Sequence, residues 1–296
     1  MATFTKMLYK IVRYSGLPFV FREFVQRYKV TFILFHDIKA DLFEQHVHYL
    51  LKNYHIISLQ QYLDARKTPH FKLTPKSLVI TLDDGLKRNY DLLPIIKKYR
   101  IPITIFLCSS IVCTHRRYWM GVQLSGYPIE VLKRMHASER DHILLTSGFD
   151  PMKEFAARET LGSDEIVEMR GYVDFQSHTR FHAILPYCEN ERAEDEILTS
   201  KRELEAKLNS AVTSISYPNG DYSERDLVLA KKGGYELGIT VDFGFNTLRT
   251  DAFRLKRLCI RDNADRDELI VKATGAWQFL KQFFGKEDHG YQEAKD

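Results

Sequence analysis

The sequence has little cysteine, little net charge and no long apolar run. Its four cysteines, among 296 residues, form no CxxC pair and no spacing typical of small disulfide-rich domains, which argues against a disulfide scaffold and a zinc ribbon. Its 43 lysine and arginine residues nearly balance 39 aspartate and glutamate residues, so a net charge of +4 gives no reason to expect nucleic acid as a partner. No stretch approaches the roughly 20 apolar residues that a membrane-spanning helix needs. The composition, 44% apolar, predicts a mixed α/β globular protein.

The first 28 residues look like an appendage to the main domain. Their apolar residues recur at the spacing of one helix face: Phe4, Met7, Leu8, Ile11 and Val12. Basic residues (Lys6, Lys10 and Arg13) occupy another face, and a second helical stretch rich in aromatic and basic residues follows. Two interpretations stay open: a helix pair that caps one end of a barrel, or a peripheral contact with anionic lipid. Because no uninterrupted apolar segment with a cleavage signal follows the first lysines, we expect a cytoplasmic location, with any lipid contact at the inner membrane surface.

From residue 29 onward, strand-like runs alternate with amphipathic helical runs. The expected strands are rich in apolar and β-branched residues: Val30–His36, His55–Ser58, Ser77–Asp83, Ile103–Leu107, Tyr172–Ser177, Thr213–Tyr217, Leu237–Val241 and Phe253–Ile260. The expected helices lie between and after them: Asp41–Lys52, Asn89–Tyr99, Ser163–Arg170, Glu189–Leu208, Ser223–Lys232 and about Arg266–Phe284. Seven or eight β/α units predict an α/β barrel over residues 29–285, with residues 286–296 as a tail. Residues 109–162 interrupt the alternation and are interpreted as an insertion on the substrate side.

Two adjacent carboxylates follow one of the expected strands, in Thr81-Leu82-Asp83-Asp84-Gly85. Active-site residues of β/α barrels are found at this end of the strands. Asp-Asp-Gly is also favourable turn chemistry, so a plain turn is the alternative. Successive side chains of a strand point to opposite faces, but a chain that turns at Gly85 can aim both carboxylates inward, one as a metal ligand and one as a base.

Two histidines follow a later strand, in His178-Thr179-Arg180-Phe181-His182. Four residues apart on a helical turn, both imidazoles can reach one cation. A solvated or capping role is the ordinary alternative for a lone histidine, but this pair follows a strand end, as the two aspartates do. Two imidazoles and one carboxylate form a three-ligand set that leaves a coordination position for water.

Together the two motifs resemble those of the polysaccharide deacetylase family, also called carbohydrate esterase family 4. The segment Thr81-Leu82-Asp83-Asp84 is similar to the family's T-F-D-D motif, with leucine in place of phenylalanine, and residues 178–182 match H-[ST]-x-x-H in full. A third motif, a strand end that contains proline, is matched loosely by Ser216-Tyr217-Pro218-Asn219-Gly220, and Leu255-Lys256-Arg257 resembles a late Leu-x-Arg segment. The resemblance extends over about residues 29–270, nearly the whole domain.

The resemblance implies a fold and a metal site. The expected fold is an α/β, deformed (β/α)7-type barrel with an N-terminal helical extension. The expected cofactor is a divalent cation, commonly Zn²⁺, with Asp84, His178 and His182 as ligands and Asp83 as the catalytic base. Co²⁺ or Ni²⁺ suits the same ligand set.

The third motif carries the expected substrate contacts. The backbone N–H of Asn219, next to Pro218, is the candidate donor that would stabilise the oxyanion of the reaction. The ring of Tyr217, with those of Tyr118 and Trp119 in the insertion, is suited to stacking on a sugar, and packing in the core is the alternative for each.

The chain departs from the widespread form of the family at two positions. It lacks the arginine that precedes the third-motif proline, and it lacks the late histidine that supplies the acid. His36 ends the first strand, which lies beside the last strand in a closed barrel, so it is the candidate acid, with a structural histidine as the alternative. Arg257 is the candidate for the missing guanidinium beside Asp83, with a surface ion pair as the alternative.

The leading functional hypothesis is a metal-dependent deacetylase that removes acetyl from an N-acetylated amino sugar in a polysaccharide, oligosaccharide or glycolipid precursor. The two departures motivate a first alternative, a catalytically silent glycan-binding barrel. A second alternative is a membrane-surface assembly protein that works through residues 1–28. Related families hydrolyse other amides, so a non-sugar substrate also stays open.

Overall fold

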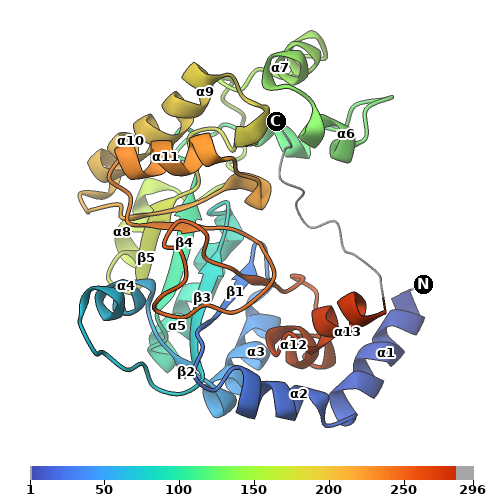
Figure 1. Cartoon of the computed structure of the whole chain (residues 1–296). Coiled ribbons are helices and arrows are strands. Elements are labelled where there is room, and N and C mark those ends of the chain that lie inside the picture. Colours follow the sequence, from blue (N-terminus) through green and yellow to red (C-terminus); the bar gives the residue numbers. More distant parts are fainter. Residues whose placement is uncertain (1, 285–296) are drawn as a thin grey trace.

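The computed structural model describes residues 2–284 and is built on a curved, entirely parallel sheet (Figure 1). The end of the predicted domain and the predicted tail, residues 285–296, lie outside the described residues. The strands are β1 (Thr31–Phe35), β2 (His55–Ile56), β3 (Ser77–Leu82), β4 (Ile103–Leu107), β5 (Val173–Ser177), β6 (Ser214–Ser216), β7 (Leu237–Ile239) and β8 (Leu258–Cys259). Their order is β7-β6-β5-β4-β3-β1-β8, with β2 paired to the start of β3. Each predicted strand is present, although several are shorter than expected.

The sheet curls because its last segment spans the space between β7 and β1. Strand β8 pairs with β1, in the register Ile33 with Leu258. A few residues earlier, Leu255 forms a parallel bridge with Ile239 of β7, and its amide donates to the carbonyl of Gly238 at 2.9 Å. Residues 252–260 therefore connect the two edges, and the predicted deformed α/β barrel is confirmed.

Helices cover the outside of the sheet, and the strands between them are buried on both faces. Every residue of β1, β3 and β4 is buried, as expected for parallel strands that are covered on both sides. The covering segments are α3 (Ala40–Asn53), α4 (Leu59–Lys67), η2 (Lys87–Leu92), α5 (Leu93–Tyr99), α8 (Ser163–Met169), α9 (Asn190–Glu194), η5 (Asp195–Thr199), α10 (Ser200–Leu208), α11 (Glu224–Lys232) and α12 (Arg266–Ala273). Because all strands run the same way, their carboxyl ends meet at one end of the barrel.

The insertion forms a small helical layer of its own. It contains η3 (Trp119–Gly121), α6 (Ile129–Arg134) and α7 (Ala137–Thr146), which pack around a separate apolar cluster that includes Trp119 and Leu144. The chain then returns to the barrel, where the amide of Leu161 donates to the carbonyl of Gly85 at 2.9 Å. The insertion is thus tied directly to the loop that follows β3.

The N-terminal helices pack against the last helices of the chain (Figure 1). The segments α1 (Ala2–Tyr14), α2 (Leu17–Val20) and η1 (Phe21–Val25) lie beside α12 and α13 (Ala276–Phe283). Tyr9 is buried, with its ring centroid 4.4 Å from that of Trp277. The single helix predicted for Arg266–Phe284 is wrong, because Gly275 has a φ of 73° and this left-handed residue divides α12 from α13. Among the described helices, none combines the length and apolar character needed to cross a bilayer.

Candidate metal centre

The loop after β3 turns both aspartates toward the interior of the barrel end. Asp84 has a φ of 71° and Gly85 a φ of 56°, so the chain leaves the extended conformation directly after Asp83. A side chain at residue 85 would not fit, because a Cβ atom there would lie 2.2 Å from the Cδ2 atom of Leu107. The oxygens of both aspartates therefore approach the same imidazole: Asp83 Oδ2 lies 3.8 Å, and Asp84 Oδ1 3.6 Å, from Nε2 of His178.

The two histidines lie on a loop, and the predicted helical turn is wrong. Thr179 and His182 have φ values of 66° and 57°, which break any helix between them. The loop instead follows the segment after β4: the amide of His178 donates to Leu107, and the amide of Ser109 donates to Thr179. The imidazoles still meet, with ring centroids 4.8 Å apart, because tertiary hydrogen bonds hold the loop in place of helical ones.

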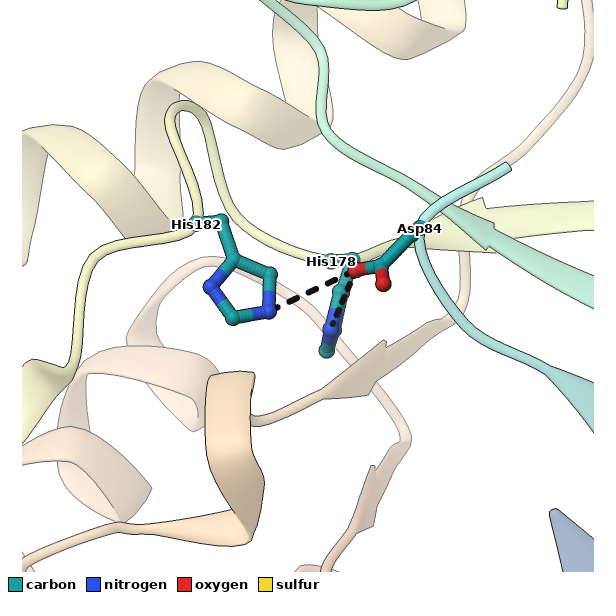
Figure 2. Close-up of side chains that lie close together, drawn as sticks. All are labelled: Asp84, His178 and His182. Atoms are coloured by element: carbon teal, nitrogen blue, oxygen red, sulfur yellow. Dashed lines mark ion pairs between the residues drawn. The ribbon is translucent and has the colours of Figure 1, made fainter. Parts of the chain in front are cut away.

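Asp84, His178 and His182 bring three ligand atoms together (Figure 2). Asp84 Oδ1 lies 3.6 Å from Nε2 of His178 and 3.4 Å from Nε2 of His182, and all three atoms lie within 4.8 Å of one another. Asp84 Oδ1 is buried, and no donor for it exists among residues 2–284. A buried carboxylate oxygen without a donor is costly unless a cation satisfies it, so this set fits a divalent metal ion.

The protonation states of the imidazoles also suit a metal. Nδ1 of His178 lies 2.8 Å from the carbonyl oxygen of Ser216, which can only accept, so a neutral His178 carries its proton on Nδ1 and presents the lone pair of Nε2. Burial is the main reason that the pKa of His182 is well below its usual value, and the neighbouring His178 lowers it further. His182 is therefore neutral near pH 7, which is the ligating form.

Beside this ligand set, Asp83 forms a buried ion pair with Arg257. The guanidinium donates from Nη1 to Oδ1 and from Nη2 to Oδ2, both at 2.8 Å, and both side chains are less than 5% exposed. Nη2 also donates to the hydroxyl of Ser216, and Nε donates to the carbonyl of Thr240. The structure thus places Arg257 in the interior against Asp83, and the surface ion pair considered from the sequence is wrong.

This ion pair fixes the charge of Asp83. Burial alone would raise the pKa of this carboxyl group, but the charge and hydrogen bonds of Arg257, together with the nearby His178, hold the pKa well below its usual value. Asp83 is therefore a carboxylate throughout the neutral pH range. By contrast, burial raises the pKa of Asp84, which has no such partner.

The aromatic residues singled out in the sequence are part of the interior. Tyr217 has no exposed surface, its hydroxyl donates to the carbonyl of Phe253, and its ring packs 5.4 Å from that of Tyr222. The hydroxyl of Tyr118 donates to the carbonyl of Asp84, and Nε1 of Trp119 donates to the carbonyl of His182. All three rings are buried, which favours packing in the interior over stacking on a sugar, and the two insertion residues hold the backbone of Asp84 and His182.

The remaining predicted residues lie at the same end of the barrel. Pro218 is buried and begins the turn η6 (Pro218–Gly220), in which Asn219 has a φ of 59° and donates its side-chain amide to Asp221 at 2.7 Å. His36 follows β1, and its backbone N–H donates to Asp262, just beyond β8. The first and last strands are therefore neighbours, as expected. His36 is half-buried.

Sequence patterns missed two residues that organise the site. The hydroxyl of Ser216 donates to Asp83 at 3.1 Å, and its carbonyl orients His178. The buried carboxylate of Glu196 accepts the backbone N–H groups of Arg180 and Phe181, at 2.9 and 2.8 Å, in the middle of the histidine loop. The available signal for Glu196 was an acidic residue next to Ile197 on the apolar side of a helix. Ser216 begins the third motif, but nothing in that motif pointed to its contacts with Asp83 and His178.

We expect Glu196→Ala to weaken divalent-cation binding by about 10–100-fold, which is the usual effect of removing a residue that holds metal ligands in place. The variant frees two N–H groups between His178 and His182, so the loop no longer holds both imidazoles at Asp84. Competition of Zn²⁺ between the protein and a chelating dye measures the affinity. Glu194→Ala on α9 is the control, because Glu194 is half-exposed and pairs with Lys232 at the surface. Equal affinities for the two variants would contradict this role.

Comparisons with known proteins identify a family and structures of similar fold. The sequence model of a family described as polysaccharide deacetylase matches residues 71–238. The putative polysaccharide deacetylase YxkH of Bacillus subtilis (strain 168) is 25% identical over 239 residues, which cover 78% of this chain and 71% of that protein. Among solved structures, the Streptococcus pyogenes deacetylase PplD in complex with acetate has a TM-score of 0.62 at 20% identity, covering 83% of this chain and 99% of that one. A polysaccharide deacetylase from Bacillus cereus has a TM-score of 0.60 at 20% identity, covering 84% and 69%. The two structures show that the fold is shared.

Proposed function

The chain belongs to the polysaccharide deacetylase family, a family of amide hydrolases, and from this premise we propose that it removes the N-acetyl group of an amino sugar. The substrate would be a polysaccharide, an oligosaccharide or a glycolipid precursor, and the products a free amine and acetate. One observation supports this proposal most directly: a three-residue metal-ligand set adjoins a carboxylate that is kept ionised by a buried arginine.

Asp84, His178 and His182 would hold the cation, for which Zn²⁺ is our first choice and Co²⁺ or Ni²⁺ are alternatives. When bound, such an ion acts as a Lewis acid toward the acetyl carbonyl and lowers the pKa of water. The chain supplies two imidazoles and one carboxylate for it, each held by a hydrogen bond to or from its own residue.

Asp83 is the proposed general base. Its oxygens lie next to His178, so a water molecule that attacks the acetyl carbon there can pass its proton to the carboxylate. Arg257 and Ser216 hold the carboxylate in one orientation through direct hydrogen bonds. The carbon–nitrogen bond then breaks, and the leaving nitrogen takes up a proton to become the amine. His36 is the proposed donor of that proton, and the backbone N–H of Asn219 is the proposed donor to the oxyanion.

Removal of the metal tests this proposal. We expect the purified protein to release acetate from N-acetylhexosamine oligosaccharides, to lose this activity on incubation with a strong chelator, and to regain it on addition of Zn²⁺, Co²⁺ or Ni²⁺. Enzymatic detection of acetate measures the reaction. Activity that survives chelation would contradict the role of the ligand set. Binding of the glycans without acetate release under any of these metals would instead favour the catalytically silent barrel.

A further inference from the structure

Exposed apolar side chains gather on the two ends of the described chain. Of the twenty large apolar side chains that are exposed within residues 2–284, eleven belong to α1, α2, η1, α13 and the residues directly after them. We call these eleven residues the apolar face: Phe4, Met7, Ile11, Tyr14, Phe19, Val20, Phe24, Tyr28, Phe279, Phe283 and Phe284. Phe24, Tyr28, Phe283 and Phe284 are each more than 70% exposed, which is unusual for rings of this size.

The segments that carry the apolar face pack against one another (Figure 1). Helix α1 contacts α2, α12 and α13, with the buried Tyr9 against Trp277. Phe21 of η1 lies 5.1 Å from Phe279 of α13, between ring centroids. Helix α1 thus uses Tyr9 to attach to the domain and leaves its apolar stripe at residues 4, 7, 11 and 14 exposed. A helix pair that caps one end of the barrel explains why Tyr9 is buried, but it does not explain why the apolar stripe of α1 is exposed.

Residues 2–29, which carry most of the apolar face, also carry the excess positive charge of the protein. Residues 2–29 contain six lysine and arginine residues and one acidic residue, Glu23, a net charge of +5 against +4 for the whole chain. Lys6 and Lys10 are exposed beside the stripe of α1, and Arg27 is exposed beside Tyr28. The remainder of the chain is therefore almost neutral, and the excess of cations coincides with the exposed aromatic rings.

We propose that the apolar face docks on a membrane surface that contains anionic lipid. Aromatic and aliphatic side chains that project from short helices, with lysines and arginines beside them, suit the boundary between headgroups and acyl chains. A second copy of the chain is a poorer occupant, because a symmetric dimer through this face would bring two sets of six cations together. The described helices do not cross a bilayer, so the contact is peripheral.

Docking would place the reaction near the lipid headgroups. A cavity of about 710 Å³ lies between Tyr9 and Trp277 on one side and Arg257 and Cys259 on the other. Arg257 lines this cavity and also binds Asp83, so the cavity extends from the helices that carry the apolar face to the residue that pairs with the base. This arrangement suits a sugar carried on a lipid; that last step rests on the proposed function, whereas the docking itself does not.

Vesicle co-sedimentation of the full chain, without substrate, tests the docking. We expect binding to vesicles of equal parts phosphatidylcholine and phosphatidylglycerol, and little binding to vesicles of phosphatidylcholine alone. Raising the salt concentration to about 1 M shortens the screening length to about 3 Å, so most of the bound protein should be released. Failure to bind the anionic vesicles at low salt would overturn the proposal.

Matched variants separate the face from the rest of the surface. Lys6→Gln/Lys10→Gln should weaken binding to anionic vesicles by about 30-fold, about 5-fold for each cation removed near the surface. Phe24→Ser/Phe283→Ser should weaken binding to these vesicles by at least tenfold, because two highly exposed rings are lost. Val228→Ser/Lys231→Gln on α11, which removes one exposed apolar residue and one lysine elsewhere, should leave binding unchanged.

Two further measurements complete the test. All variants should keep the circular dichroism spectrum and the acetate release from a soluble oligosaccharide, since none of these residues contacts the site. A control variant that loses binding as strongly as the face variants would overturn the proposal. So would analytical ultracentrifugation that shows a dimer for the parent and a monomer for Phe24→Ser/Phe283→Ser, because a second copy would then be the occupant.

Discussion

Replacement of Asp83 by asparagine is expected to lower kcat for acetate release by about 10²–10⁴-fold, the range typical for loss of a general base. The amide keeps the size of the side chain and an oxygen that can accept from Arg257, but it cannot accept a proton from water. Because Asp83 is not one of the three ligand residues, Zn²⁺ affinity should change little. Acetate release and Zn²⁺ titration of the same preparation measure the two quantities separately.

Asp64→Asn is the matched control for Asp83→Asn. Asp64 is exposed on α4 and accepts a hydrogen bond from Gln60. Its variant should keep the parent's kcat. An Asp83→Asn variant that retains the parent's fold by circular dichroism and more than a tenth of its kcat would rule out Asp83 as the base, and the role of Arg257 would then be structural alone.

Replacement of Arg257 by methionine is expected to reduce the free energy of unfolding at neutral pH by about 3–5 kcal/mol. The change leaves the Asp83 carboxylate buried without its cation, and it also removes donors to Ser216 and Thr240. Urea denaturation followed by circular dichroism measures the difference. Arg254→Met is the control, because Arg254 forms a partly exposed pair with Glu224, and its loss should cost no more than about 1 kcal/mol.

The pH dependence and a second substitution test the cause of this loss. The pKa of Asp83 is lower in the folded protein than in the unfolded chain, so the ion pair stabilises the parent above the unfolded pKa, and this stabilisation is lost as the pH falls. In Arg257→Met the carboxyl group of Asp83 can become neutral in acid. The difference in the free energy of unfolding between parent and variant should therefore narrow as the pH falls. The double variant Asp83→Leu/Arg257→Met should recover much of the lost stability. A gap that stays constant with pH, or no recovery in the double variant, would contradict an electrostatic origin.

Several parts of the fold and the site follow from local sequence. Continuous apolar and β-branched runs predict the parallel strands, since strands covered on both faces need such residues at nearly every position. The Asp-Asp-Gly segment predicts a turn that aims two carboxylates inward, and Gly85 is required there by both φ and packing. The cytoplasmic location stays a prediction, and the individual catalytic roles stay predictions that the experiments on metal removal and on Asp83 test.

Contacts between distant segments decided the rest. The sequence alone determined the strands and most of the helices, because those patterns depend on neighbours a few residues away. It left open whether Arg257 lies beside Asp83, 174 residues away, and whether Tyr217 is a core residue, and it did not point to Glu196 as the residue that holds the histidine loop. These depend on the closure of the sheet, which brings the ends of β3, β6 and β8 to one end of the barrel. Local pattern therefore set the elements and the reactive residue types, and the curvature of the barrel decided which of those residues meet.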